Sequence, residues 1–101
     1  MSESVIRMSE TGELLLSGVL DYRTGPNLRK QGQTLIKSSN AAALVVDCSA
    51  VEKSSSVGLS LLLCFMRDAQ AAGKTLSIRA MPDDMREIAQ VSELTELLAH
   101  P

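Results

Sequence analysis

Residues 44–66 read LVVDCSAVEKSSSVGLSLLLCFM, and this stretch decides the fold. Residues 43–48 form an apolar run bounded by turn-forming residues, which is typical of a fully buried strand. Three serines and a glycine follow, and a leucine-rich segment then continues to about residue 72. Ser56 stands just before this segment, so we expect it to be the N-cap of a helix. Its hydroxyl would then lie at the positive end of the helix, a natural place for an anion or a negatively charged partner group.

The sequence before this stretch predicts a β-hairpin and a helix. Residues 4–8 and 14–20 have the character of strands, and the turn-forming sequence SETG at 9–12 separates them. Pro26 suits the first turn of a helix, where its missing N–H is not needed. We expect this helix to end at residues 38–40.

The sequence after the leucine-rich segment predicts one more strand and a closing helix. Gly73 is placed to end the leucine-rich helix, and residues 75–80 alternate like a strand. Two acids at 83–84 then precede a short amphipathic helix, at the end that acids favour. A last apolar turn consists of Leu94, Leu97 and Leu98.

The predicted order of elements is β-β-α-β-α-β-α, which indicates an α/β fold. Strands that are joined through helical crossovers lie parallel, while the opening hairpin is antiparallel. We therefore expect a small mixed β-sheet, with an N-terminal antiparallel hairpin and the remaining strands parallel, packed with helices. With 101 residues, the chain should form a single domain over residues 1–101.

The composition argues against several classes of function. The net charge is −2 and aromatic residues make up 2% of the chain, so both the basic surface and the stacking platforms of a nucleic-acid-binding protein are missing. No segment has the ~18 consecutive apolar residues of a membrane span, and the N-terminus lacks a secretory signal. Cys48 and Cys64 are the only cysteines. We interpret them as buried free thiols of a cytoplasmic protein, with a disulfide or a metal pair as the alternative.

The leucine-rich helix has an inner face and an outer side when it is wound at about 100° per residue. The inner face consists of Gly58, Leu62, Phe65, Met66 and Ala69. The outer side consists of Val57, Ser60, Leu61, Cys64 and Ala71. A surface helix normally turns a charged stripe to solvent, and this outer side has none, so we expect it to be covered. We favour a protein partner that docks around Ser60 and Cys64; the alternative cover is the amino-terminal part of the first helix.

The serine run has a structural and a functional interpretation. Serines at the start of a helix are most often caps, each contributing about 1 kcal/mol. The alternative is a docking or regulated hydroxyl. A phosphate on Ser56 would add up to about two negative charges, which a helix N-terminus tolerates but an apolar or acidic partner surface would repel.

The sequence does not predict an enzyme. The single histidine, His100, lies one residue from the C-terminus, so no Ser–His or Cys–His relay is available. The cysteines lack zinc-ligand spacing, and the glycines match no phosphate-binding loop, so we expect no metal and no cofactor. Asp47, Glu52 and Asp68 are expected to be solvated. A domain of this size fills its interior with side chains, so we expect no bound lipid.

The central stretch resembles the STAS family, which includes bacterial anti-sigma-factor antagonists. The matching pieces are 46–49 with Val51, and 55–59 with the leucines at 61–63. The resemblance implies the STAS fold and makes Ser56 the phospho-acceptor or the docking centre. Ser55 stands where the family usually has an acid, and Val57 where it has a small residue. Both departures count against recognition by a dedicated serine kinase and leave docking untouched.

Within this family, residues 1–4, LLLSGVLD at 14–21 and VGLSLLL at 57–63 are similar to the STAS subunits of Gram-negative phospholipid ABC transporters. This resemblance implies a non-catalytic cytoplasmic subunit, peripheral to the inner membrane, that binds and supports the transporter ATPase and so helps to maintain outer-membrane lipid asymmetry. The alternative is an anti-sigma-factor antagonist that is regulated by phosphorylation of Ser56. The expected partner-binding residues are Ser55, Ser56, Val57, Gly58, Ser60, Leu61 and Cys64.

Overall fold

The computed structural model describes residues 4–91, which contain four strands and three helices. In chain order they are β1 (Val5–Met8), β2 (Glu13–Leu20), α1 (Gly25–Ser38), β3 (Ala43–Ser54), α2 (Ser56–Ala71), β4 (Thr75–Arg79) and α3 (Asp83–Val91). This order confirms the predicted one. The expected apolar turn at Leu94, Leu97 and Leu98 lies outside the described residues. Within residues 4–91, no helix combines the length and the apolar character needed to cross a bilayer.

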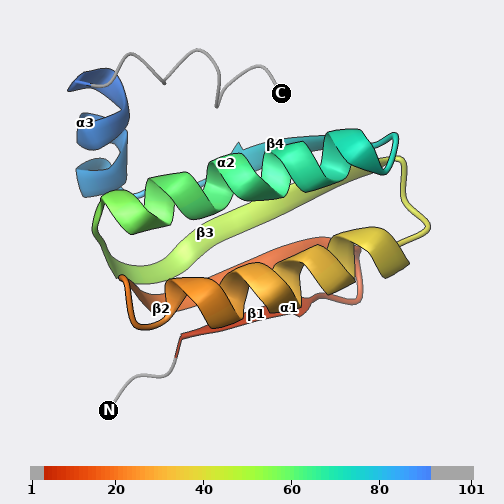
Figure 1. Cartoon of the computed structure of the whole chain (residues 1–101), viewed down its shortest axis with the longest axis horizontal. Helices are drawn as coiled ribbons and strands as arrows, with labels where there is room; N and C mark the ends of the chain where they lie inside the picture. The colour runs from red at the N-terminus through yellow and green to blue at the C-terminus, as the bar shows by residue number, and fades with distance from the viewer. Residues whose placement is uncertain (1–3, 92–101) are drawn as a thin grey trace.

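The four strands form one mixed sheet in the order β1-β2-β3-β4. β1 pairs antiparallel with β2, whereas β2–β3 and β3–β4 are parallel, as predicted. α1 and α2 lie side by side on one face of the sheet, and α3 stands beside the amino end of α2 (Figure 1). Pro26 lies in the first turn of α1, and Gly73 follows α2 with a φ of +72°. Both residues therefore bound their helices as the sequence predicted.

β3 is longer than the sequence predicts, because it continues beyond Cys48 to Ser54. Its second half pairs with the end of β2, from Ser17 opposite Ala50 to Leu20 opposite Ser54, with one register shift just before Ser17 and another between Gly18 and Val19. The polar side chains in this half gave no apolar pattern to detect, yet the long-range ladder satisfies their backbone groups. Only Ser55 is left between β3 and α2, so the predicted serine loop is a single residue.

The core lies between the sheet and the α1–α2 pair. The strands contribute Leu14, Leu16, Leu20, Leu44, Val46 and Leu76, and the helices contribute Leu28, Ile36, Leu62 and Phe65. α1 packs tightly on α2 at Gly32, where a Cβ would lie 2.3 Å from a ring carbon of Phe65. This glycine therefore lets the ring of Phe65 pack against the backbone of α1.

Asp47 and Asp68 are not solvated in the way that the sequence suggested. Asp47 accepts a hydrogen bond at 2.7 Å from Arg79, which also pairs with Glu13, and another at 2.8 Å from the Ser49 N–H. These bonds, that from Arg79 foremost, lower the pKa of Asp47 from 3.8 to about 2. Asp68 is buried between α1 and α2. In both cases a distant segment supplies the partner, which a local pattern does not reveal.

We predict that Gly32→Ala destabilises the protein by about 1–3 kcal/mol, because the added methyl overlaps the ring of the fully buried Phe65. The gain in helix propensity from Gly to Ala is about 1 kcal/mol and is included in this net figure. Urea unfolding would measure the loss. The matched control is Gln31→Ala at the exposed neighbouring position, which should change stability by less than about 0.5 kcal/mol. A Gly32→Ala variant as stable as the wild type would contradict the packing described.

Candidate functional site

The N-cap of α2 is Ser55, so the prediction that Ser56 caps this helix is wrong by one residue. Ser55 is extended, and its Oγ accepts a hydrogen bond from the Val57 N–H at 3.1 Å. Its own N–H donates to the Leu20 carbonyl at 3.0 Å, and its hydroxyl reaches the same carbonyl at 3.3 Å. The reason for the shift is the extension of β3 to Ser54, which leaves Ser55 as the joint between strand and helix.

Ser56 is the first residue of α2, and its side chain is exposed. Among the hydrogen bonds of residues 4–91, none involves its hydroxyl. The structure thus divides the serine run between two roles. Ser55 holds the start of the helix, and Ser56 presents an unengaged hydroxyl at the positive end of the helix dipole.

Gly58 faces the interior of the molecule. A Cβ on Gly58 would lie 2.0 Å from the Ser54 Oγ and 3.1 Å from a side-chain carbon of Leu20. The first turn of α2 therefore rests directly on the ends of β2 and β3. Gly58 is one of the expected partner-binding residues, but its evident role is structural, because the lack of a side chain allows this close approach.

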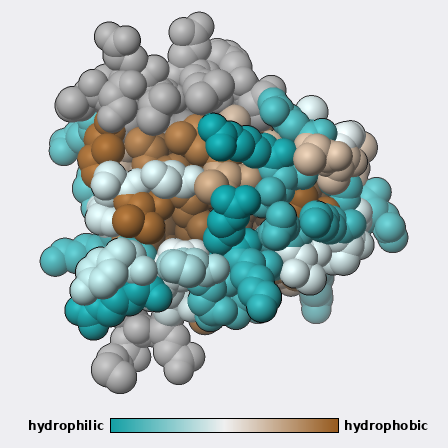
Figure 2. Space-filling model, in the orientation of Figure 1, coloured by the Kyte–Doolittle hydropathy of each residue, from teal (hydrophilic) through white to brown (hydrophobic). Residues whose placement is uncertain are grey.

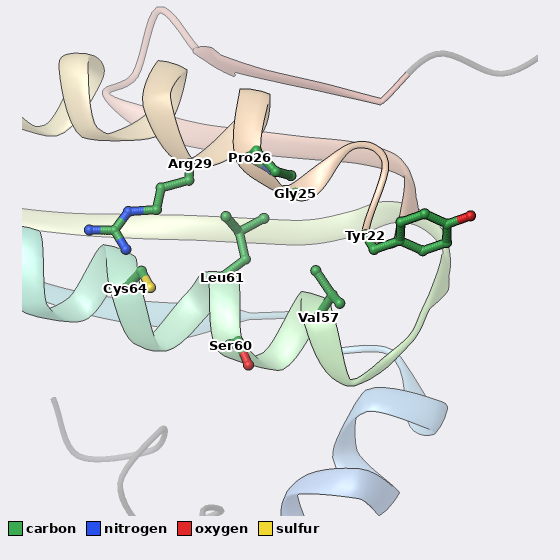
Figure 3. A pocket seen from close by; sticks show the side chains of 8 residues that line it. All are labelled: Tyr22, Gly25, Pro26, Arg29, Val57, Ser60, Leu61 and Cys64. Atoms are coloured by element: carbon green, nitrogen blue, oxygen red, sulfur yellow. The ribbon is translucent and has the colours of Figure 1, made fainter.

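A shallow groove of about 460 Å³ runs between the amino-terminal halves of α1 and α2. One wall consists of Tyr22, Gly25, Pro26 and Arg29, and the other of Val57, Ser60, Leu61 and Cys64 (Figure 3). Val57 and Leu61 point toward α1, whereas the Ser60 hydroxyl points away from it. Figure 2 shows apolar surface over the amino-terminal half of α2, while the opposite end of this face is polar.

Of the two expected covers of the outer side of α2, the amino-terminal part of α1 covers one part of that side. The start of α1 covers Leu61, which is only 4% exposed, and Gly25 approaches Val57 so closely that a Cβ would lie 2.9 Å from Val57 Cγ1. Ser60 stays exposed, and Cys64 is half-buried along the groove. α1 therefore covers Leu61 and leaves a groove open beside it.

Sequence reasoning missed the α1 wall of the groove. Tyr22 is 74% exposed, the one large hydrophobic side chain so exposed within the described residues. The Arg23 guanidinium lies 5.9 Å from the centre of its ring, within cation–π range. A lone tyrosine in the turn that precedes a helix-opening proline was the available signal, but only the packing of α1 on α2 gives it a position in the site.

Arg29 brings a positive charge to the groove. Its Nη2 lies 3.6 Å from Oδ1 of Asp68, and the Arg29 side chain is 45% exposed while that of Asp68 is 10% exposed. The Gln33 amide donates to the same Oδ1 at 3.5 Å, whereas Oδ2 is buried and has no partner within the described residues. The carboxylate therefore supports Arg29 from behind without using up its five N–H donors.

The two cysteines lie in different surroundings. Both thiols are free; Cys48 is buried as expected, whereas Cys64 is only half-buried. Burial raises the pKa of Cys48 to about 12, with a smaller contribution from the charge of Asp47, so its thiol stays protonated at neutral pH. Across residues 4–91, no group of three His, Cys, Asp or Glu side chains is arranged to hold a metal ion.

The start of α3 contacts Ser54, the last residue of β3, and the sequence did not indicate this contact. Asp84 Oδ2 accepts a hydrogen bond from the Ser54 N–H at 3.2 Å, and Oδ1 accepts one from the Met85 N–H at 2.8 Å. The Asp84 carboxylate is therefore bonded to the backbone two positions before Ser56 in the sequence. Any negative charge added to Ser56 would enter a region that already carries the Asp84 carboxylate.

Comparison with known protein families identifies the family of this chain. The family described as "MlaB, STAS domain" matches residues 4–99. The chain belongs to the STAS family. The expected STAS fold is thereby confirmed, together with the mixed sheet and the helices that cover it.

Solved structures similar to this STAS protein include two kinds. A chain of the Acinetobacter MlaFEDB complex, in an ATP-bound conformation, is 25% identical with a TM-score of 0.82, and the match covers 96% of this chain and 99% of that one. The unphosphorylated anti-sigma factor antagonist SpoIIAA is 19% identical (TM-score 0.72; 93% and 84% covered). An anti-sigma factor antagonist from Mycobacterium paratuberculosis is 24% identical (TM-score 0.75; 98% and 85% covered). The two antagonists share the fold.

We predict that Ser55→Ala and Ser56→Ala have different effects on the stability of this STAS protein. Ser55→Ala removes both the cap and the bond to Leu20, and should cost about 1 kcal/mol or more of unfolding free energy. Ser56→Ala removes an exposed hydroxyl without a partner and should change stability by less than about 0.5 kcal/mol. Urea unfolding of the two variants side by side makes the comparison, and equal losses would mean that Ser55 is not the N-cap.

Proposed function

We propose that this STAS protein is a non-catalytic subunit that binds and supports the ATPase of an ABC-type phospholipid transporter, on the cytoplasmic side of the inner membrane. The observation that carries the proposal is the exposed, largely apolar groove at the amino end of α2, the helix that begins at the exposed Ser56. The likeness to a chain of the MlaFEDB complex, over almost the full length of both chains, supports this kind of assembly. Its role in lipid transport would be to hold the ATPase in a competent state and so to help maintain outer-membrane lipid asymmetry.

The geometry of the site suits docking better than chemistry. Ser56 has no histidine beside it in residues 4–91, and its own hydroxyl makes no hydrogen bond that would activate it. The groove is open and walled mainly by uncharged side chains on two rigid helices. A preformed surface of this kind loses little conformational entropy when a partner binds. We therefore propose that the site residues act by contact: Ser55 and Gly58 set the position of α2, and Ser56, Val57, Ser60 and Cys64 meet the partner, with Leu61 as the floor.

We predict that Ser60→Glu weakens binding of the transporter ATPase at least about tenfold, because a carboxylate would be buried unpaired in the interface. Ser56→Asp and Val57→Glu should also reduce the association. Co-purification of the tagged protein with the ATPase of the same organism, followed by titration of the purified partners, measures the loss. Ser60 is the most informative position for this test, since its hydroxyl is exposed and points away from α1, so that the change leaves the packing of α1 untouched.

The matched control for this experiment is Gln70→Glu, which adds the same charge at an exposed position ten residues further along α2. It should bind the ATPase as the wild type does. If Ser60→Glu, Ser56→Asp and Val57→Glu all bind as tightly as this control, the amino end of α2 is not the docking surface.

A second candidate function is that of an anti-sigma-factor antagonist switched by phosphorylation. The exposed Ser56 hydroxyl, which makes no hydrogen bond within residues 4–91, favours it, and the fold shared with SpoIIAA agrees with it. Ser55 and Val57 depart from the motif of that group, and the nearby Asp84 carboxylate opposes a phosphate. Mass spectrometry of the protein isolated from cells in several growth phases would decide the matter. On our proposal Ser56 carries no phosphate, and stoichiometric phosphate there would favour the antagonist.

A further inference from the structure

We infer that the groove between α1 and α2 binds a segment of the ATPase that presents an Asp or Glu carboxylate to Arg29 beside an apolar side chain that packs on Tyr22. This inference rests on the proposed function and deepens it, because it names the chemistry of the partner segment and two recognition residues on α1 and its preceding turn.

The charge of the groove is the first argument. Arg29 is the one charged residue among the eight that line it. Its guanidinium extends across the groove toward Cys64 of α2 (Figure 3). Asp21 lies close in sequence, but its carboxylate accepts hydrogen bonds from the Arg23 and Thr24 N–H groups of its own turn and does not line the groove. An incoming segment therefore meets a positive charge with no acid on the groove surface.

The free donors of Arg29 are the second argument. Its pairing with Asp68 is long, at 3.6 Å, and within the described residues its side chain makes no hydrogen bond. A guanidinium has five donors in a planar fork that matches a carboxylate in two parallel bonds. With the Asp68 carboxylate behind it and nearly half of its surface exposed, Arg29 is held in place and still free to bind a second carboxylate from the groove side.

The apolar wall is the third argument. Tyr22 is 74% exposed, although large aromatic side chains on a protein surface commonly serve as anchors in an interface. The Arg23 guanidinium lies over its ring and adds positive charge near the mouth of the groove. Pro26 and Val57 extend the apolar surface between Tyr22 and Arg29. An apolar side chain followed by an acid along one segment fits this order. The groove is too open to enclose a lipid chain, so we assign it to a protein segment.

The experiment compares Asp68→Asn with the double variant that carries Asp68→Asn and Arg29→Gln. In this background, loss of Arg29 leaves no buried carboxylate unpaired. Addition of Arg29→Gln to Asp68→Asn should weaken ATPase binding about tenfold and should reduce its salt dependence. Tyr22→Ala in the wild-type chain should also weaken binding, without loss of folding stability. The matched control is Arg67→Gln on α2, an exposed arginine that does not line the groove, and it should change affinity less than about twofold.

A photo-crosslinking residue in place of Tyr22 identifies the segment that occupies the groove. We expect an ATPase peptide with an Asp or Glu within one helical turn of the crosslink. Reversal of that acid to Arg should restore binding to Arg29→Glu in the Asp68→Asn background. Capture of lipid, a captured peptide without an acid, or equal binding by Asp68→Asn with and without Arg29→Gln overturns the inference and leaves the proposed function standing. Failure of the wild type to bind the ATPase overturns both.

Discussion

The pairing of the end of β2 with the end of β3 is the constraint on which the site depends. It carries β3 to Ser54 opposite Leu20, and the Leu20 carbonyl then receives both the N–H and the hydroxyl of Ser55. The Leu20 carbonyl, at the end of the β2–β3 ladder, thus fixes the residue from which α2 starts. Because Gly58 places the first turn of α2 against Leu20, the direction of the helix follows from the same contact.

The groove follows from the way in which the two helices pack. At Gly32 the backbone of α1 meets the ring of Phe65, which draws the helices together in the middle of α1. Toward their amino ends, the residues that line the groove include Gly25 and Pro26 on one side, and Ser60 and Cys64 on the other. These side chains are too small to fill the space above Leu61. A tight contact and a hollow surface are therefore produced by the same pair of helices, and the floor between them is rigid because Leu61 is buried.

Local signals were enough to predict most of the fold. The SETG turn, Pro26 and Gly73 act within a few residues of themselves, and they gave the hairpin and the helix ends correctly. The second half of β3 was missed because its backbone is satisfied by β2, some 30 residues earlier in the chain, and not by any pattern of its own side chains. The same error moved the predicted cap from Ser55 to Ser56.

The charge distribution of the site and the exposure of its side chains could not be predicted from the sequence, for a related reason. The burial of Asp68 and the position of Arg29 depend on each other across the α1–α2 contact, and Tyr22 becomes part of a surface only through that contact. The shared STAS scaffold explains why the inner face of α2 was predictable, since the core of any such fold demands it. It does not determine what the groove binds, because a fold sets positions while the side chains at those positions set the partner. Arg29 and Tyr22 lie on the surface of α1 and its preceding turn, where the core places few demands on residue type. Specificity can therefore vary at these positions without disturbing the joint at Ser55.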